Sequence, residues 1–308
     1  MDPKISIKVI LKDDKYILEK NGKPCPKVYL KLIQFMKIPK AYETVWLSKN
    51  KESNIQAIAL DSKNRKQYYY SKEWIANRSS EKFQRMYKFM KKMPLLDKSI
   101  QTDIKQKMDT KTKTMAIMLK IVQLTHIRIG NKKYMDQNSS SGLTTLKKSN
   151  VLKCNNSSTV LKFTGKHKVE HTIEIKDPTI AKFIKHNLTT PKDWIMKFKS
   201  SDGEYYRVSA QDLNDYIHSI IGDGFSCKDF RTHGANVTFY ETLKSLVFPE
   251  TPSKIKSNII KAMDVTAVKL GNNRSTSKSS YVMDHIILTY TKNPKCIKKN
   301  LIDLVREI

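Results

Sequence analysis

Four short stretches of the sequence each carry a reactive or uncommon side chain inside a segment with a clear local pattern. They are HIRIGNKKY with Arg128, FTGKHKVEH with Lys166, CKDFRTHGANVTF with Arg231, and LGNNRSTSKSSYV with Tyr281. A tyrosine oxygen can attack phosphorus, two arginines can bind the non-bridging phosphate oxygens through forked donors, and a lysine can protonate the departing oxygen. Together the four stretches indicate covalent chemistry on a phosphodiester.

Each of these residues also has a purely structural interpretation when it is taken alone. Arg128 could rest its stem on the core beside an apolar helix, and Lys166 could be a solvated charge in a hairpin loop. Arg231 could belong to a basic helix face, and Tyr281 could be a half-buried aromatic residue. Only their combination in one strongly basic chain favours catalysis.

The composition favours a polyanionic partner. The chain of 308 residues has 58 Lys and Arg against 29 Asp and Glu, which gives a formal net charge of +29. Neutralisation of the phosphate backbone by basic side chains dominates nucleic-acid binding, so nucleic acid is the first candidate. Only eight of the basic residues are arginines. Because lysine cannot bind phosphate in a bidentate manner, each of these few arginines is a candidate for that role.

Other chemistries have little support in the sequence. No pair of carboxylates recurs at a spacing suited to Mg²⁺, and there is no Walker-type loop, so we expect no metal, no ATP and no other cofactor. The four cysteines, Cys25, Cys154, Cys227 and Cys296, are scattered, and we expect free thiols in a reducing compartment. No apolar run reaches the length of a membrane span, and residues 1–4 do not lead into a signal peptide, so no membrane association is expected.

The first part of the chain is predicted to be β-rich. Alternating apolar residues bounded by turn residues predict strands at 4–11, 16–20, 43–48, 55–60 and 66–71, with turns at 21–22 and 61–64. A short helix is expected at 28–36. We therefore predict a small β-rich domain at residues 1–78.

The rest of the chain, residues 79–308, is predicted to be a mostly helical domain with one β-hairpin insertion, so the fold class is α+β. A helical pattern begins at 81 and is expected to end at Pro94. Residues 160–165 and 169–175 alternate around a short loop, which predicts a hairpin with Lys166 at its tip. Further helices are expected at 115–122, 179–188, 209–221, 226–243, 253–270, 281–290 and 296–307.

The order of these blocks resembles a known family. HIRIGNKKY, GLTTLKK at 142–148, KFTGKHKVEH, KDFRTHGANVTF and LGNNRSTSKSSY resemble the catalytic blocks of the poxvirus-type type IB DNA topoisomerases, which share a catalytic fold with the tyrosine recombinases. DSKNRKQYYYS at 61–71 resembles a strand-and-turn block in the N-terminal domain of that family. Several ordered blocks at compatible spacing are far more specific than any one of them.

The resemblance implies a role for each reactive residue. Tyr281 would form a 3′-phosphotyrosyl link, Arg128 and Arg231 would bind the scissile phosphate, and Lys166 would protonate the 5′-oxygen that leaves. Strand rotation and religation would then relax supercoils without ATP or metal. The family has a histidine nine residues before the tyrosine, where this sequence has Asn272. Because an asparagine NH₂ can donate a hydrogen bond to phosphate without carrying a charge, Asn272 joins the expected catalytic set.

The resemblance also implies a C-shaped clamp that binds double-stranded DNA as a monomer. Lys228, three residues before Arg231, could have a secondary phosphate or acid role. If the source is viral, the virion and the host cytoplasm are the expected locations; otherwise we expect the cytoplasm or nucleoid. The residues expected to contact DNA are Lys228, Arg65, Tyr68, Tyr70, Lys72, Asn236, Arg274 and Lys278.

Two alternatives stay open at this stage. A tyrosine recombinase uses the same chemistry in a synaptic tetramer, although the short tail after Tyr281 and the β-rich N-terminal unit favour the topoisomerase. A non-catalytic DNA-binding or packaging protein could keep the same fold, and Asn272 is the feature that favours that alternative.

Overall fold

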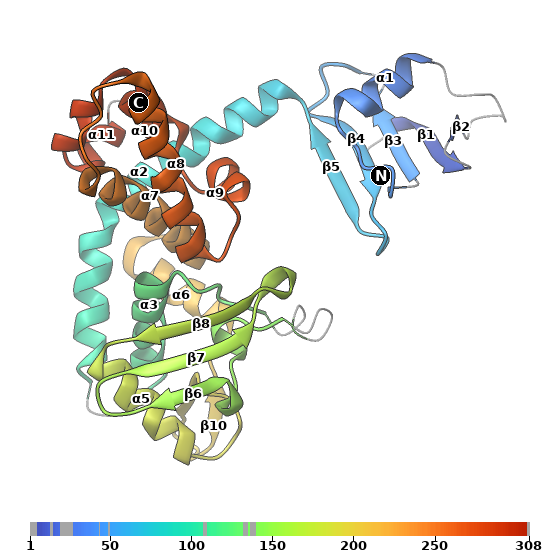
Figure 1. The fold of residues 1–308 in the computed structure, drawn as a ribbon. Helices are drawn as coiled ribbons and strands as arrows, with labels where there is room; N and C mark the ends of the chain where they lie inside the picture. The colour runs from blue at the N-terminus through green and yellow to red at the C-terminus, as the bar shows by residue number, and fades with distance from the viewer. Residues whose placement is uncertain are drawn as a thin grey trace. The chain divides into compact units, whose positions relative to one another are not determined.

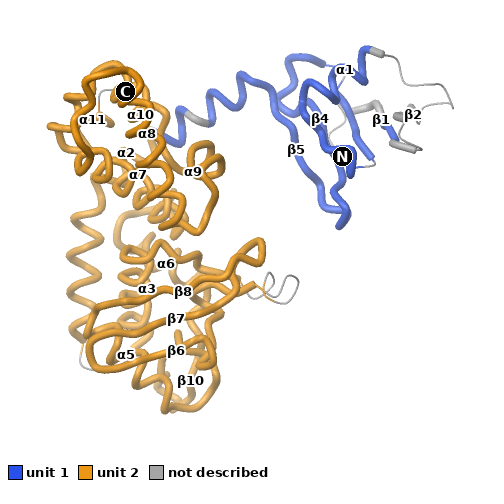
Figure 2. Tube along the Cα trace, viewed as in Figure 1, with its two compact units in different colours: residues 1–83 blue, residues 84–308 orange. Residues whose placement is uncertain are grey.

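The computed structural model describes residues 5–12, 15–18, 27–42, 44–48, 50–106, 110–131, 135 and 140–306. The chain forms two compact units, residues 1–83 and 84–308 (Figure 2). The division falls inside helix α2 (Lys72–Ile104), whereas the sequence predicted a boundary at 78/79. The expected turn at 21–22 and Cys25 lie outside the described residues. The first unit is built mainly on an antiparallel sheet and the second mainly on helices with two smaller sheets, which is consistent with an α+β fold.

The first unit contains a five-stranded antiparallel sheet in the order β2-β1-β3-β4-β5 (Figure 1). Its core consists mainly of alternating apolar positions on the strands, such as Val45, Leu47 and Ala57, together with Ile33 from helix α1. All five predicted strands and the predicted helix are confirmed within a few residues. Their bounds are β1 Ile5–Lys12, β2 Lys15–Leu18, α1 Lys27–Phe35, β3 Thr44–Ser48, β4 Ile55–Leu60 and β5 Lys66–Tyr70.

The prediction that a helix ends at Pro94 is wrong, because Pro94 lies inside helix α2. Proline removes one helical hydrogen bond and is normally unfavourable there. Here the helix buries Met86 and Phe89 on one side of Pro94 and Leu96 and Ile100 on the other. Burial of large apolar side chains, each contributing about 1.5–3 kcal/mol, outweighs the lost bond and keeps the helix continuous.

The second unit is built on helices, and two of them, α3 and α7, are buried along most of their length. The helix predicted at 281–290 starts later, at Asp284. The helix predicted at 296–307 is divided into a 3₁₀ turn at Pro294–Lys298, which Asn293 caps, and the short helix α11. The helices are α3 Lys111–Thr125, α5 Pro178–Thr189, α6 Ala210–Ile221, α7 Cys227–Ser245, α8 Pro252–Leu270, α9 Arg274–Ser280, α10 Asp284–Lys292 and α11 Leu301–Arg306.

The predicted hairpin is confirmed as β7 (Thr159–Thr164) and β8 (Glu170–Ile175), paired in antiparallel register. Strand β6 (Val151–Cys154) pairs with the other edge of β7, and a second small sheet contains β9 (Lys197–Lys199) and β10 (Tyr205–Arg207); these three strands were not predicted. Among the described residues, no helix combines the length and the apolar character needed to cross a membrane.

Candidate active site

Arg231 is fixed early in helix α7 by local capping. The backbone N–H of Ser226 donates to Asp229 Oδ2 at 2.7 Å, which starts the helix one turn before Arg231. The guanidinium is buried, with 6% of its residue surface exposed. Arg231 Nη2 donates to the carbonyl oxygen of Leu270 at 3.0 Å, and Nη1 donates to that of His126. Both carbonyls lie at helix C-termini, whose partial negative charge stabilises a buried cation.

Arg128 follows the end of α3 and is held through its backbone. The carbonyl oxygen of Arg128 accepts a hydrogen bond from the N–H of Leu143 at 2.9 Å. The Gly142 backbone lies so close to Gly130 that a Cβ on Gly142 would come within 2.5 Å of the Gly130 Cα and within 2.7 Å of the Arg128 carbonyl oxygen. Two glycines are therefore needed for the segment at 142–145 to support the arginine.

Asn272 lies beside Arg128 at the end of α8. Gly271 ends this helix in the left-handed region, with φ 60°, and the Asn272 N–H donates to the carbonyl oxygen of Ala267 at 2.9 Å. Asn272 Oδ1 accepts a hydrogen bond from Arg128 Nη2 at 2.8 Å. Within the described residues, the buried Asn272 Nδ2 and Arg231 Nε have no hydrogen-bond partner. Two unpartnered buried donors are unusual, and they can serve a bound anion.

Tyr281 stands directly after α9 and is half-buried. Its ring centroid lies 5.5 Å from the Arg231 Cζ. Its carbonyl oxygen accepts from Asn236 Nδ2 at 3.0 Å, while Asn236 Oδ1 accepts from the Met283 N–H at 2.9 Å. Asn236 is fully buried, and both ends of its amide are hydrogen-bonded within the protein, so its contact with DNA stays a prediction that this geometry does not support. Its amide holds the backbone on both sides of Val282.

The charges around Tyr281 favour an ionised phenol and a bound anion. Burial raises the pKa of Tyr281, but the positive charges of Arg231 and Arg128 and the polar groups of Arg231 and Asn272 outweigh it, so the pKa lies below the usual value. Burial and the neighbouring charge of Arg128 lower the pKa of Arg231 to about 10. Arg231 is still protonated at neutral pH, and an anion between the two arginines would relieve their repulsion.

Comparisons with known proteins agree with this geometry. A family model for the catalytic core of eukaryotic DNA topoisomerase I matches residues 63–308. DNA topoisomerase 1B of Acanthamoeba polyphaga mimivirus is 35% identical over 270 residues, covering 85% of this chain and 80% of that protein. The chain belongs to the type IB DNA topoisomerase family. DNA topoisomerase 1B of Vaccinia virus (strain Copenhagen) is 28% identical over 288 residues, covering 89% of this chain and 84% of that protein.

Among solved structures, the XerH site-specific recombinase bound to a palindromic difH substrate is 14% identical, with a TM-score of 0.42 over 67% of this chain and 52% of that chain. That similarity is too weak to bear on function. The type IB DNA topoisomerase assignment therefore rests on the family model and the viral relatives.

Two tyrosines near the C-terminal end of this type IB DNA topoisomerase family member have different surroundings. Tyr290 is completely buried, and its hydroxyl accepts a hydrogen bond from Asn258 Nδ2 at 3.2 Å. It cannot approach a DNA phosphate without unfolding of the surrounding helices. Of the two, only Tyr281 is positioned to act as the nucleophile.

Lys166 lies at the tip of the β7–β8 hairpin and is exposed. Within the described residues, it makes no hydrogen bond or ion pair and does not contact Arg128, Arg231 or Tyr281 through one. The structure therefore brings four of the five predicted catalytic residues together and leaves the lysine on a neighbouring hairpin.

The other residues expected to contact DNA are on the surface, but some already have partners. In the second unit Lys228 and Lys278 are exposed, while Arg274 donates twice to Asp264, at 2.6 and 2.7 Å. In the first unit Arg65 Nε donates to Asp61 at 2.8 Å, and Lys72 Nζ lies 5.2 Å from the Phe35 ring. Tyr68 is 46% exposed, and Tyr70 stacks on Trp74 with centroids 3.8 Å apart.

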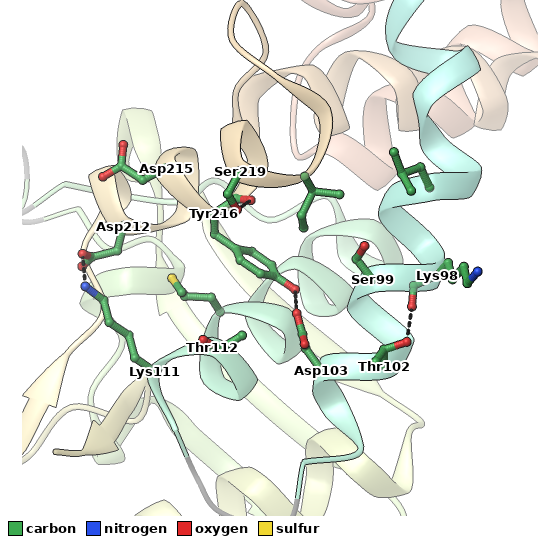
Figure 3. Close-up of a pocket in the computed structure, with 13 residues that line it drawn as sticks. Lys98, Ser99, Thr102, Asp103, Lys111, Thr112, Asp212, Asp215, Tyr216 and Ser219 are labelled. Carbon is green, nitrogen blue, oxygen red and sulfur yellow. Dashed lines mark hydrogen bonds and ion pairs between the residues drawn. The ribbon is translucent and has the colours of Figure 1, made fainter. Parts of the chain in front are cut away.

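A separate cavity of about 660 Å³ lies among α2, α3 and α6 (Figure 3). Four of its polar side chains form pairs: the Tyr216 hydroxyl donates to Asp103 at 2.6 Å, and Lys111 forms an ion pair with Asp212 at 2.5 Å. It contains none of the predicted catalytic residues. The described part of the chain also contains no cluster of three or more His, Cys, Asp or Glu side chains suited to a metal ion.

His126 is a supporting residue that the sequence analysis missed. It ends α3 with φ 53°, and its ring fills the space that a side chain at Gly234 would need. Within the described residues, neither ring nitrogen has a hydrogen-bond partner. Burial, with the charges of Lys269 and Arg231, lowers the pKa of His126 to about 4. The ring is therefore neutral, and its carbonyl serves Arg231.

This low pKa predicts acid sensitivity. In the unfolded chain a histidine titrates near 6.5, so between about pH 6.5 and 4 the unfolded state binds more protons, and stability is lost as the pH falls. We expect His126 alone to lower the free energy of unfolding by about 2–3 kcal/mol over that range. Urea unfolding measured at several pH values tests this. His126→Asn, which tolerates the left-handed backbone and does not titrate, should have a shallower slope; an unchanged slope would contradict the assignment.

Proposed function

We propose that this protein relaxes supercoiled duplex DNA by cutting and resealing one strand through a covalent link to Tyr281. One observation carries the proposal: the buried, unpartnered donors of Arg231 and Asn272 and the forked side chain of Arg128 form one cluster beside Tyr281. Arg231 Cζ lies 5.5 Å from the Tyr281 ring, Arg128 donates to Asn272, and all three side chains lower the pKa of the phenol. This arrangement suits a tetrahedral phosphate and the additional negative charge that develops on its oxygens during attack.

In the cleavage step the Tyr281 hydroxyl loses its proton to solvent, and its oxygen forms a bond to phosphorus. The bond between phosphorus and the 5′-oxygen breaks, and that oxygen receives a proton from Lys166. The lowered pKa of Tyr281 increases the fraction of the nucleophilic phenolate at neutral pH. Religation is the reverse: the 5′-hydroxyl attacks, Lys166 recovers its proton, and Tyr281 is released. The phosphotyrosyl bond retains the energy of the broken diester, so no nucleotide hydrolysis is required.

The protein is further proposed to bind duplex DNA as a monomeric C-shaped clamp. The net charge of +29 supports a polyanionic partner. Exposed Tyr68 and the neighbouring Tyr70 are the proposed groove contacts of the first unit, and Lys228 and Lys278 are proposed phosphate contacts of the second. Arg65 and Arg274 would have to share or exchange their carboxylate partners to contact DNA.

Relaxation of supercoiled plasmid in EDTA, followed by denaturation during turnover, tests the proposed activity. We expect relaxed circles and, after denaturation, protein attached to the 3′ end of a nicked strand whose 5′ end is a free hydroxyl that polynucleotide kinase labels without prior phosphatase treatment. Relaxation should persist at enzyme concentrations too low for tetramers, which separates it from recombination. Salt-dependent DNA binding without any adduct would instead support a non-catalytic protein.

Asn272 is expected to supply a phosphate donor in place of the family's histidine. Removal of one such donor typically lowers the rate about 10²–10³-fold, so Asn272→Ala should reduce single-turnover cleavage by about 10²-fold. Asn272→His should stay within about 10-fold of wild type and acquire a pH dependence near 6–7, because an imidazole titrates there. Cleavage rates measured from pH 5 to 9 test both variants. A wild-type rate for Asn272→Ala would remove Asn272 from the site.

A further inference from the structure

His171 occupies a place that neither the sequence blocks nor the proposed mechanism explains. It lies in β8 opposite Phe163 of β7, and the two rings stack with centroids 5.1 Å apart and planes 19° apart. The side chain is half-buried. Within the described residues, its ring nitrogens make no hydrogen bond, so packing is what fixes the ring.

Two glycines make room for this ring. An added Cβ on Gly165 would lie 2.7 Å from the His171 ring, and one on Gly271 would lie 2.3 Å from its Cε1. Contacts under 3.0 Å are essentially never seen for real Cβ atoms, so neither position can carry a side chain while the ring stays in place. Gly165 directly precedes Lys166, and Gly271 directly precedes Asn272. The ring therefore packs between the backbone next to the proposed general acid and the backbone next to the proposed phosphate donor.

We propose that His171 is a positioning residue that holds the Lys166 hairpin against the Gly271–Asn272 turn, so that the lysine reaches the leaving 5′-oxygen. The inference deepens the proposed function and rests on it. Lys166 is exposed at the hairpin tip and, within the described residues, has no hydrogen bond or ion pair of its own. Its reach is thus set by the strand ends that flank the hairpin loop, where His171 packs. The Ser141 N–H donates to the Thr164 carbonyl oxygen at 2.8 Å and holds the same end of β7.

The electrostatic surroundings agree with a packing role. Burial and the charges of Arg128 and Arg231 lower the pKa of His171, and only Glu170 acts in the opposite direction. The two charged arginines therefore favour the neutral form of the ring over a third cation at the phosphate site. The inference depends on the fit of a flat ring between two glycine backbones, and the lowered pKa agrees with it.

The test compares two DNA substrates with one scissile bond each, one with the natural 5′-oxygen and one with a 5′-bridging sulfur at that bond. A thiolate leaves without help from a general acid because its conjugate acid is much stronger than an alcohol. Misplacement of a catalytic group by about 1 Å can reduce a rate about 10²-fold. We therefore expect His171→Ala to cleave the natural substrate about 10–100-fold more slowly than wild type and the sulfur substrate within about 3-fold of wild type.

Three further variants sharpen the comparison. Lys166→Ala should show the same selective defect, because it removes the acid itself. His171→Phe keeps a flat ring of similar size without nitrogens and should cleave both substrates within a few-fold of wild type. Thr172→Ala changes the next, exposed position of β8 and serves as the matched control. The ratio of rates on the two substrates is taken within each variant, so partial unfolding of His171→Ala does not affect it.

Several results would overturn the inference. They are a wild-type rate for His171→Ala on natural DNA, an equal defect on both substrates, and a His171→Phe defect as large as that of His171→Ala, which would indicate a direct contact between the imidazole and phosphate. A wild-type protein that forms its adduct normally in these experiments keeps the proposed function intact even then. Absence of any wild-type adduct on either substrate would overturn both proposals.

Discussion

Tyr281→Phe is expected to abolish the covalent protein–DNA adduct and to reduce plasmid relaxation by about 10⁴-fold or more, the range seen when a catalytic nucleophile is removed. The substitution deletes only the hydroxyl oxygen. The ring stays against Arg231, and the backbone hydrogen bond from Asn236 Nδ2 to the Tyr281 carbonyl is unaffected. The variant should fold and bind duplex DNA like wild type, so the loss would be chemical. Denaturing gels of end-labelled DNA measure the adduct directly.

Tyr290→Phe is the matched control, because it deletes the same atom nine residues away. Tyr290 is buried and its hydroxyl interacts with Asn258, so this change should cost about 1 kcal/mol of stability and leave the adduct in place. An adduct that survives in Tyr281→Phe, or disappears in Tyr290→Phe while the protein remains folded, would contradict the assignment of the nucleophile.

Much of the candidate site could be predicted, because the proposed chemistry requires particular side chains in a particular order. Arg128, Arg231, Asn272 and Tyr281 lie in separate blocks, and the structure brings them together at the ends of α3, α8 and α9 and the start of α7. Local patterns also gave the five strands of the first unit and the β7–β8 hairpin, since alternation and turn residues act over short distances.

The errors and omissions arise where tertiary contacts decide. Asn236 is polar and lies on a helix in a basic block, but its burial and its hydrogen-bond partners 45 and 47 residues away give it a structural role that no local pattern indicates. The local pattern predicts a helix end at Pro94, because proline is unfavourable inside a helix. Burial of Leu96 and Ile100 beyond Pro94, a tertiary effect, keeps the helix continuous. The place of His171 depends on Gly165 in the adjoining hairpin loop and on Gly271, which is distant in sequence, and the only signal at either position is the absence of a side chain.

Arg231→Lys is expected to lower single-turnover cleavage and religation by about 10²–10³-fold or more while it leaves DNA affinity at low salt nearly unchanged. The guanidinium uses its two Nη atoms on the carbonyls of His126 and Leu270 and keeps Nε, without a partner in the described structure, for the phosphate. An ammonium is a single point of charge and cannot bind both carbonyls and a phosphate oxygen in one plane. Arg231→Lys therefore keeps the positive charge but loses the planar set of N–H donors.

The appropriate control is Arg306→Lys, an exposed position at the end of α11, which should behave like wild type. Separate measurement of DNA affinity and of the cleavage rate at saturating enzyme distinguishes the two contributions of an arginine. If Arg231 acted only through its charge, both rates would survive in Arg231→Lys. If it acted only by stabilising the fold, the variant would lose DNA binding and thermal stability together with activity. We expect the cleavage rate to fall while DNA affinity is kept. The carbonyls of His126 and Leu270 orient the planar guanidinium before DNA binds, and lysine cannot be oriented in this way.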